Sequence, residues 1–133
     1  GGSRNNPGPA ALGVVVKDEA GKILANYGEF LGNQTNNYAE YMAIISALKK
    51  AHELGATEVD CIADSKLVIE QLKGNWRVKE PTLQKLFVQA WNAMQKFKKV
   101  TLTHTLRAGN KEADAEVNKI LDALVGEKKG FHP

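Results

Sequence analysis

Residues 58–72 read EVDCIADSKLVIEQL, and the spacing of the apolar side chains changes within this stretch. The pattern predicts a buried strand over residues 58–63 and a short helix over residues 65–72. A strand that passes directly into a helix is typical of α/β proteins, whose ligands bind at the carboxyl ends of strands. Asp64 occupies that position, so it is a candidate site residue. Its alternative role is to cap the helix, for which Ser65 competes.

The rest of the chain extends this alternation on both sides. The pattern predicts a β-hairpin and a long helix before the stretch, and a basic connector, a helix, a strand and a final helix after it. The expected ranges are a loop at 1–10, strands at 12–16, 22–31 and 100–106, helices at 37–54, 82–97 and about 110–125, and a frayed tail at 126–133. We therefore expect a single domain, residues 1–133, with a mixed α/β sheet and helices on its faces.

Composition narrows the class of protein. Hydrophobic residues make up 43% of the 133 residues and charged residues 25%, which argues against disorder. The single cysteine, Cys61, excludes a disulfide framework within the chain and a cysteine-based zinc site, and it favours a reducing compartment. No apolar run approaches the roughly 20 residues that a membrane span needs, and no secretory leader is visible. We expect a cytoplasmic monomer without a membrane segment.

Two further carboxylates stand where the pattern predicts apolar side chains. Glu40 heads the apolar stripe of the helix at 37–54, and Asp114 lies one turn into the final helix. Each has a structural alternative, because Asn37 and Glu40 have capping-box spacing and an acid in a first helical turn favours the helix dipole. Together with Asp64, however, three elements each direct one acid to the same end of the sheet. Oxygen ligands without histidine or cysteine suit a hard cation such as Mg²⁺ or Mn²⁺.

Basic side chains gather in one part of the chain. Residues 73–99 carry seven Lys or Arg side chains and one acid, Glu80. Such a stretch suits a polyanion, since Lys and Arg that neutralise phosphates release condensed counterions; the alternative is a solvated helix face. Carboxylates beside a basic flank favour metal-assisted phosphoryl chemistry. Trp76, within the stretch, is expected to pack in the core, with contact to a substrate as the alternative.

Four motifs, in order and at the expected spacing, resemble type 1 ribonuclease H. They are GGSRNNPGPA at residues 1–10, TNNYAEYMA at 35–43, ADSKLVIEQL at 63–72 and NKEADAEVN at 110–118. The likeness covers nearly the whole chain and is greatest to the compact bacterial and archaeal members without a basic protrusion. It implies a five-stranded mixed sheet and an enzyme that hydrolyses the RNA strand of RNA–DNA hybrids. The family uses two Mg²⁺ ions, with Mn²⁺ as a possible substitute, and leaves 5′-phosphate and 3′-hydroxyl ends.

The resemblance also implies roles for individual residues. Glu40, Asp64 and Asp114 match three of the family's four catalytic, metal-binding acids. The asparagine pair after Thr35 would read 2′-hydroxyls in the minor groove of the hybrid, which distinguish RNA from DNA. Lys66 stands where many members have glutamine, and Arg107 stands where some have a loop histidine. The full set of expected substrate-binding residues is Ser3, Asn6, Asn36, Asn37, Lys66, Arg77, Lys79 and Arg107.

One family feature is absent from the sequence. The fourth acid of the family is an aspartate at the end of the first strand, and it directly precedes the residue that matches Gly1. We therefore expect that the sequence is incomplete or truncated and that it lacks the central strand of the sheet. If that aspartate is truly absent, the alternative function is a catalytically impaired domain that binds hybrids. A second alternative, from another class, is a fragment or interaction domain of a larger polymerase-like protein.

Overall fold

The chain begins with an antiparallel sheet in the computed structural model, which describes residues 2–3 and 6–106. Its three strands lie in the order β1 (Gly2–Ser3), β2 (Gly8–Lys17) and β3 (Ile23–Gln34). Asp18 closes the turn between β2 and β3, since its Oδ1 accepts the backbone N–H groups of Ala20 and Lys22, each at 2.9 Å. Gly21 in this turn has a φ of 83°, a conformation that glycine adopts without strain. The predicted hairpin is confirmed.

A second sheet holds two parallel strands, β4 (Glu58–Ala63) and β5 (Lys99–His104). Parallel strands need a crossover connection, and α2 (Lys66–Leu72) and α3 (Pro81–Met94) supply it here. Ala63 pairs with His104, so both strands end at the same edge of the sheet. The antiparallel and parallel sheets together form the mixed α/β architecture that the sequence predicts.

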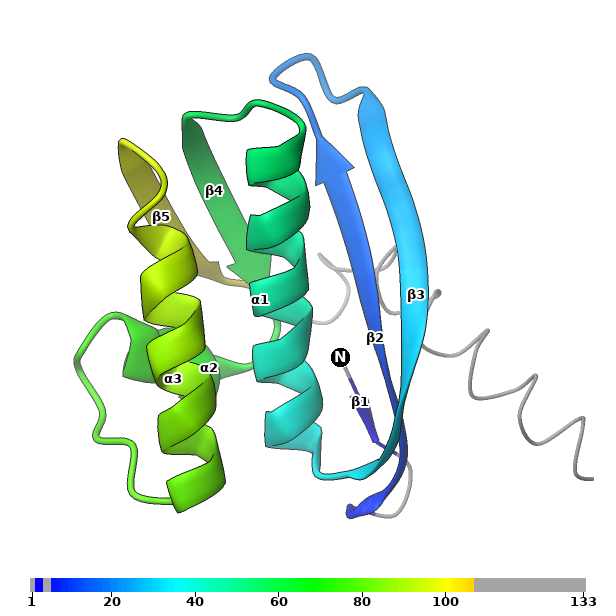
Figure 1. Ribbon diagram of the computed structural model, residues 1–133, viewed down its shortest axis with the longest axis vertical. Coiled ribbons are helices and arrows are strands. Elements are labelled where there is room, and N and C mark those ends of the chain that lie inside the picture. The colour runs from blue at the N-terminus through cyan, green and yellow to red at the C-terminus, as the bar shows by residue number, and fades with distance from the viewer. Residues whose placement is uncertain (1, 4–5, 107–133) are drawn as a thin grey trace, which may run out of the picture.

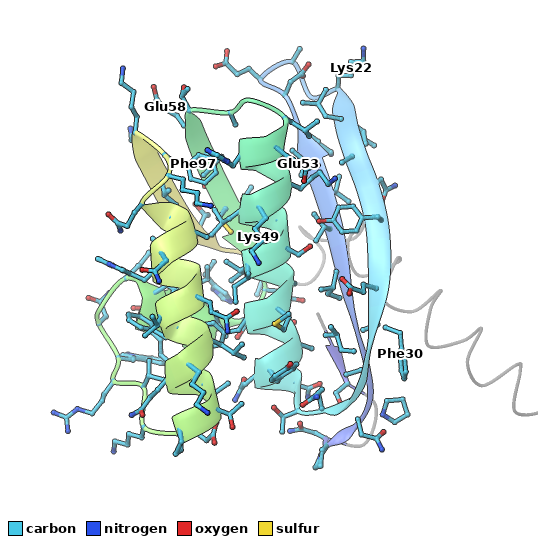
Figure 2. The ribbon with its side chains drawn as sticks, in the orientation of Figure 1. Lys22, Phe30, Lys49, Glu53, Glu58 and Phe97 are labelled. Carbon is cyan, nitrogen blue, oxygen red and sulfur yellow. The ribbon has the colours of Figure 1, made fainter. Side chains whose placement is uncertain are left out.

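The long helices lie side by side on one face of the strands (Figure 1). The first of them, α1 (Asn36–Glu53), packs against both β2 and α3. Tyr41, Ile45 and Leu48 of α1 are at most 2% exposed. Phe97, labelled beside α1 in Figure 2, is also buried, and its ring meets that of His52 edge-on with centroids 5.9 Å apart. This packing fixes the position of α1 relative to the strands.

The first ten residues depart from the predicted fold. The sequence predicts a loop over residues 1–10, but Gly2–Ser3 form β1 and residues 8–10 already belong to β2. Glycine, proline and alanine have low β-propensity and no apolar alternation here, so the pattern does not indicate a strand. Pairing with β3 decides the conformation instead, with Pro9 opposite Asn33, and Ala10 is fully buried.

Two of the predicted segments, the final helix and the tail, belong to the end of the chain. The final helix at about 110–125 and the tail at 126–133 lie outside the described residues. Within residues 2–3 and 6–106, no helix combines the length and the apolar character that crossing a membrane requires.

Candidate active site

Glu40 lies just beyond the first turn of α1 and is only 8% exposed. Burial, together with the nearby Asp64 carboxylate, raises the pKa of Glu40 to about 7. The capping-box alternative is wrong, because α1 begins one residue earlier than predicted and its N-cap is Thr35. The Oγ1 of Thr35 accepts the Tyr38 N–H at 3.2 Å. Helix capping therefore does not explain the Glu40 carboxylate.

Asp64 directly follows β4 and is partly buried. The helix-cap alternative is wrong for this residue too, since Ser65 caps α2 and its Oγ accepts the Val68 N–H at 3.3 Å. The effect of Asp64 on the pKa of Glu40 indicates that the two carboxylates lie close together. The fold thus places an acid from a helix near an acid that follows the end of a strand.

The donor set fits a hard divalent cation. Two carboxylates near one another favour a positive charge between them, and Mg²⁺ prefers oxygen ligands. Among the described residues, no three acidic, histidine or cysteine side chains form a group that could hold a metal ion. Asp114, the expected third acid, lies outside the described residues, as does Arg107.

Three of the expected substrate-binding residues meet at the start of α1. The Asn36 N–H donates to Asn6 Oδ1 at 2.8 Å, and the Ser3 N–H donates to Asn36 Oδ1 at 2.7 Å. Ser3 Oγ also donates to the Gln34 carbonyl at 2.7 Å. We call Ser3, Asn6 and Asn36 the loop cluster. Asn36 and Glu40 are four residues apart in one helix, so the cluster lies about one turn from the acid pair.

The basic connector, residues 74–79, links α2 to α3. Arg77 and Lys79 are exposed in it, as a contact with phosphates requires. Trp76 is 44% exposed, so the expectation that it packs in the core is wrong. Lys66 Nζ lies 5.9 Å from the centroid of the Trp76 ring, a cation–π geometry. Lys66 therefore lies beside the connector, although it belongs to α2.

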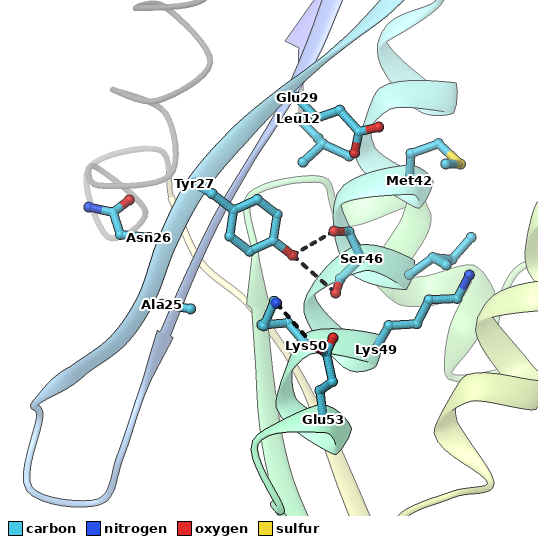
Figure 3. Close-up of a pocket in the computed structure, with 11 residues that line it drawn as sticks. Leu12, Ala25, Asn26, Tyr27, Glu29, Met42, Ser46, Lys49, Lys50 and Glu53 are labelled. Atoms are coloured by element: carbon cyan, nitrogen blue, oxygen red, sulfur yellow. Dashed lines mark hydrogen bonds and ion pairs between the residues drawn. The ribbon is translucent and has the colours of Figure 1, made fainter.

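A separate groove lies between β3 and α1, with a volume of about 670 Å³ (Figure 3). Four of its polar side chains contact one another in pairs. Tyr27 Oη is 2.6 Å from Ser46 Oγ, and Lys50 Nζ is 3.4 Å from Glu53 Oε1. None of the residues predicted for catalysis or substrate binding lines this groove.

Sequence patterning missed one buried polar residue near the site. Gln71 of α2 is 5% exposed and contacts both α1 and the connector. The sequence feature that could have revealed it is its place in a short helix next to apolar residues that are buried. A glutamine buried at such a position needs hydrogen-bond partners.

Sequence comparisons find relatives over most of the chain. A family model described as reverse transcriptase-like matches residues 1–120. Ribonuclease HI of Halobacterium salinarum is 43% identical over 122 residues, which cover 92% of this chain and 61% of that protein. A bifunctional protein of Mycobacterium tuberculosis is 45% identical over 124 residues, which cover 92% of this chain and 34% of that protein. The chain thus spans between 34% and 61% of the length of these two curated relatives.

Solved structures match the chain over nearly their whole length. RNase H1 from the halophilic archaeon Halobacterium salinarum has a TM-score of 0.88 at 42% identity, covering 91% of this chain and 92% of its own. LC11-RNase H1, in a complex with an RNA/DNA hybrid, has a TM-score of 0.88 at 36% identity. The match covers 93% of this chain and 94% of that one. The N-terminal RNase H domain of a Mycobacterium tuberculosis protein has a TM-score of 0.86 at 44% identity. The match covers 89% of this chain and 91% of that one.

Proposed function

Because this chain belongs to the ribonuclease H family, we propose that it is an endoribonuclease that cleaves the RNA strand of RNA–DNA hybrids. One observation carries the proposal. The carboxylates of Glu40 and Asp64, from two different elements, come together about one helical turn from the loop cluster. A site that joins acids to amide groups beside a basic connector suits the hydrolysis of a phosphodiester.

We propose that Glu40, Asp64 and Asp114 hold two Mg²⁺ ions, for which Mn²⁺ can substitute. When bound, the ions would activate an attacking water and stabilise charge on the phosphate. Packing of α1 and pairing of β4 fix where the first two carboxylates lie. The low exposure of Glu40 strengthens its electrostatic interactions, because less water screens its charge.

Substrate recognition would divide between two regions. Asn36 and Asn37, with Ser3 and Asn6, would contact the RNA strand near its 2′-hydroxyls. Lys66, Arg77, Lys79 and Arg107 would contact phosphates. The complex of LC11-RNase H1 with an RNA/DNA hybrid supports the choice of substrate. We further propose that the protein acts as a monomer in the cytoplasm, a setting that its single cysteine favours.

The chemistry of the new ends tests the proposed reaction. The full-length protein is incubated with Mg²⁺ and a hybrid whose RNA strand carries a 5′ label. We expect labelled fragments with a free 3′-hydroxyl, which a polymerase can extend. Fragments that end in a 2′,3′-cyclic phosphate would show attack by the RNA's own hydroxyl rather than by water, and would contradict the mechanism.

The basic connector and Lys85 of the neighbouring helix α3 provide a prediction about affinity. Replacing Arg77, Lys79 and Lys85 with alanine should raise KM more than it lowers kcat, because these exposed side chains bind phosphates rather than the reacting group. The slope of log affinity against log salt should become shallower by up to about 0.9 for each phosphate that the variant no longer neutralises. Steady-state kinetics and hybrid titrations over a salt series measure both effects.

A matched control removes the same charge elsewhere. Lys22 lies on the β2–β3 turn and Lys49 on the later part of α1 (Figure 2), where Lys50 follows it (Figure 3). Their replacement with alanine should leave KM and the salt slope near the parent values. Equal effects of the two triple variants would mean that Arg77, Lys79 and Lys85 form only a solvated face.

Asn36 provides a prediction about the choice of strand. Asn36→Ala removes the amide that accepts the Ser3 N–H, so the loop cluster loses one of its links. We expect a larger loss of hybrid cleavage than of general duplex affinity. Thr35→Ala is the control, since Thr35 and not Asn37 caps the helix, and losing the cap should cost about 1 kcal/mol of stability. If the loss of activity in each variant only follows its loss of stability, Asn36 stabilises the fold and does not contact the RNA strand.

A further inference from the structure

Gln71 is an unusual residue in the core. Glu40 and Gln71 are the two buried polar or charged side chains among the described residues, and Gln71 is 5% exposed. A buried amide is unfavourable unless both of its ends find partners. Gln71 has both, because its Oε1 accepts the Tyr41 O–H at 2.6 Å and its Nε2 donates to the Arg77 carbonyl at 3.2 Å.

The two partners belong to the two halves of the proposed site. Tyr41 is fully buried in α1 and follows Glu40 directly in the sequence. Arg77 lies in the basic connector, the segment that loops outward between α2 and α3 in Figure 1. One side chain thus joins the helix that carries a catalytic acid to the backbone of the segment that carries the phosphate-binding cations.

We propose that Gln71 is a positioning residue that holds the basic connector at a fixed place relative to the acid pair. This inference rests on the proposed function. For cleavage, the phosphates of one strand of the hybrid must bind Arg77 and Lys79 while the other strand lies at Glu40 and Asp64. A fixed distance between the two regions therefore favours binding in the productive register, and its loss should weaken binding more than it slows the chemical step.

The hydrogen bonds of Gln71 can be removed while the other hydrogen bonds of the connector remain. The Asn75 and Trp76 N–H groups donate to the Glu70 carbonyl at 2.9 and 3.2 Å, and Gln84 Nε2 donates to the Val78 carbonyl at 2.9 Å. These hydrogen bonds keep the ends of the connector in place when Gln71 is changed. We therefore expect the variant to fold, with a looser middle of the connector.

Gln71→Met tests the inference, since methionine keeps the length of the side chain and forms neither hydrogen bond. Tyr41→Phe removes only the O–H at the other end of the link. Ile69→Val is the matched control, because Ile69 is a fully buried residue of the same helix that has no part in the link. The readouts are hydrogen exchange over residues 73–80 in the absence of substrate, melting temperature, and KM and kcat on the hybrid.

We expect Gln71→Met to speed exchange in the connector and to raise KM about fivefold, the shift that corresponds to the loss of the one hydrogen bond to the connector, at the Arg77 carbonyl, with kcat within about twofold. Tyr41→Phe should act in the same direction, and Ile69→Val should lower the melting temperature without changing KM. A normal KM with faster exchange, or unchanged exchange in Gln71→Met, would overturn the inference. Hydrogen exchange is measured without substrate, so it tests the role of Gln71 even if the parent protein does not cleave hybrids. Absence of cleavage by the parent would contradict the proposed function only.

Discussion

Asp64→Asn is expected to abolish cleavage while binding of the hybrid persists or improves. Asp64 follows β4 and lies near Glu40, so its carboxylate is a direct ligand in our account. Replacing even an outer partner of a metal ligand typically costs up to about 100-fold in activity, and a direct ligand should cost more. Binding should survive, because the variant has one negative charge fewer near the phosphates. Single-turnover cleavage and a hybrid titration, both in Mg²⁺, separate the two effects.

Asp60→Asn is the matched control for this result. Asp60 lies on β4, the strand that Asp64 follows, and is exposed, and its Oδ1 accepts the Thr103 hydroxyl at 2.8 Å. An asparagine oxygen can accept the same hydrogen bond, so the control should cleave at nearly the parent rate. Near-parent turnover by Asp64→Asn in Mg²⁺ would remove Asp64 from the site.

Glu40→Gln is expected to change activity and stability in opposite directions. Cleavage should be lost, since an amide is a poorer ligand than a carboxylate for a hard cation. In chelator at pH 8, however, the variant should be more stable than the parent by about 3 kcal/mol, because it no longer buries a charge. Urea unfolding measures the difference in the free energy of unfolding.

The pH dependence of that difference follows from the raised pKa of Glu40. The folded protein holds this proton up to about pH 7, whereas the unfolded chain releases it near the ordinary value of 4.5. The parent therefore loses stability as the pH rises between these two values, and glutamine does not. The stability gain should disappear at pH 4. Mg²⁺ should raise the melting temperature of the parent and not of the variant; a variant less stable than the parent in chelator at pH 8 would contradict this account of Glu40.

The strand and helix around Asp64 could be predicted closely from the sequence. β4 has the predicted bounds, and α2 begins one residue after the predicted start, because the competing cap is Ser65. This accuracy has a local cause. The apolar period changes at one point, and a serine that can cap the helix stands at that point.

Other features depend on interactions that are distant in sequence. The start of β2 is a strand because β3 pairs with it, and its own residues carry no strand pattern. The link from Tyr41 through Gln71 to Arg77 joins residues that are 30 and 6 positions apart. The predicted start of α1 is one residue late because Thr35 and Asn37 both favour caps, and only the hydrogen bond from Tyr38 decides between them.

The central claim is that this protein cuts RNA only where RNA is paired with DNA. The measurement that tests it most directly compares three duplexes of one sequence, RNA–DNA, RNA–RNA and DNA–DNA, with each strand labelled in turn and Mg²⁺ present. We predict that the full-length protein cleaves the RNA strand of the hybrid and leaves its DNA strand and both other duplexes intact. A hybrid that is bound but stays whole, or cleavage of all three duplexes alike, would contradict the claim.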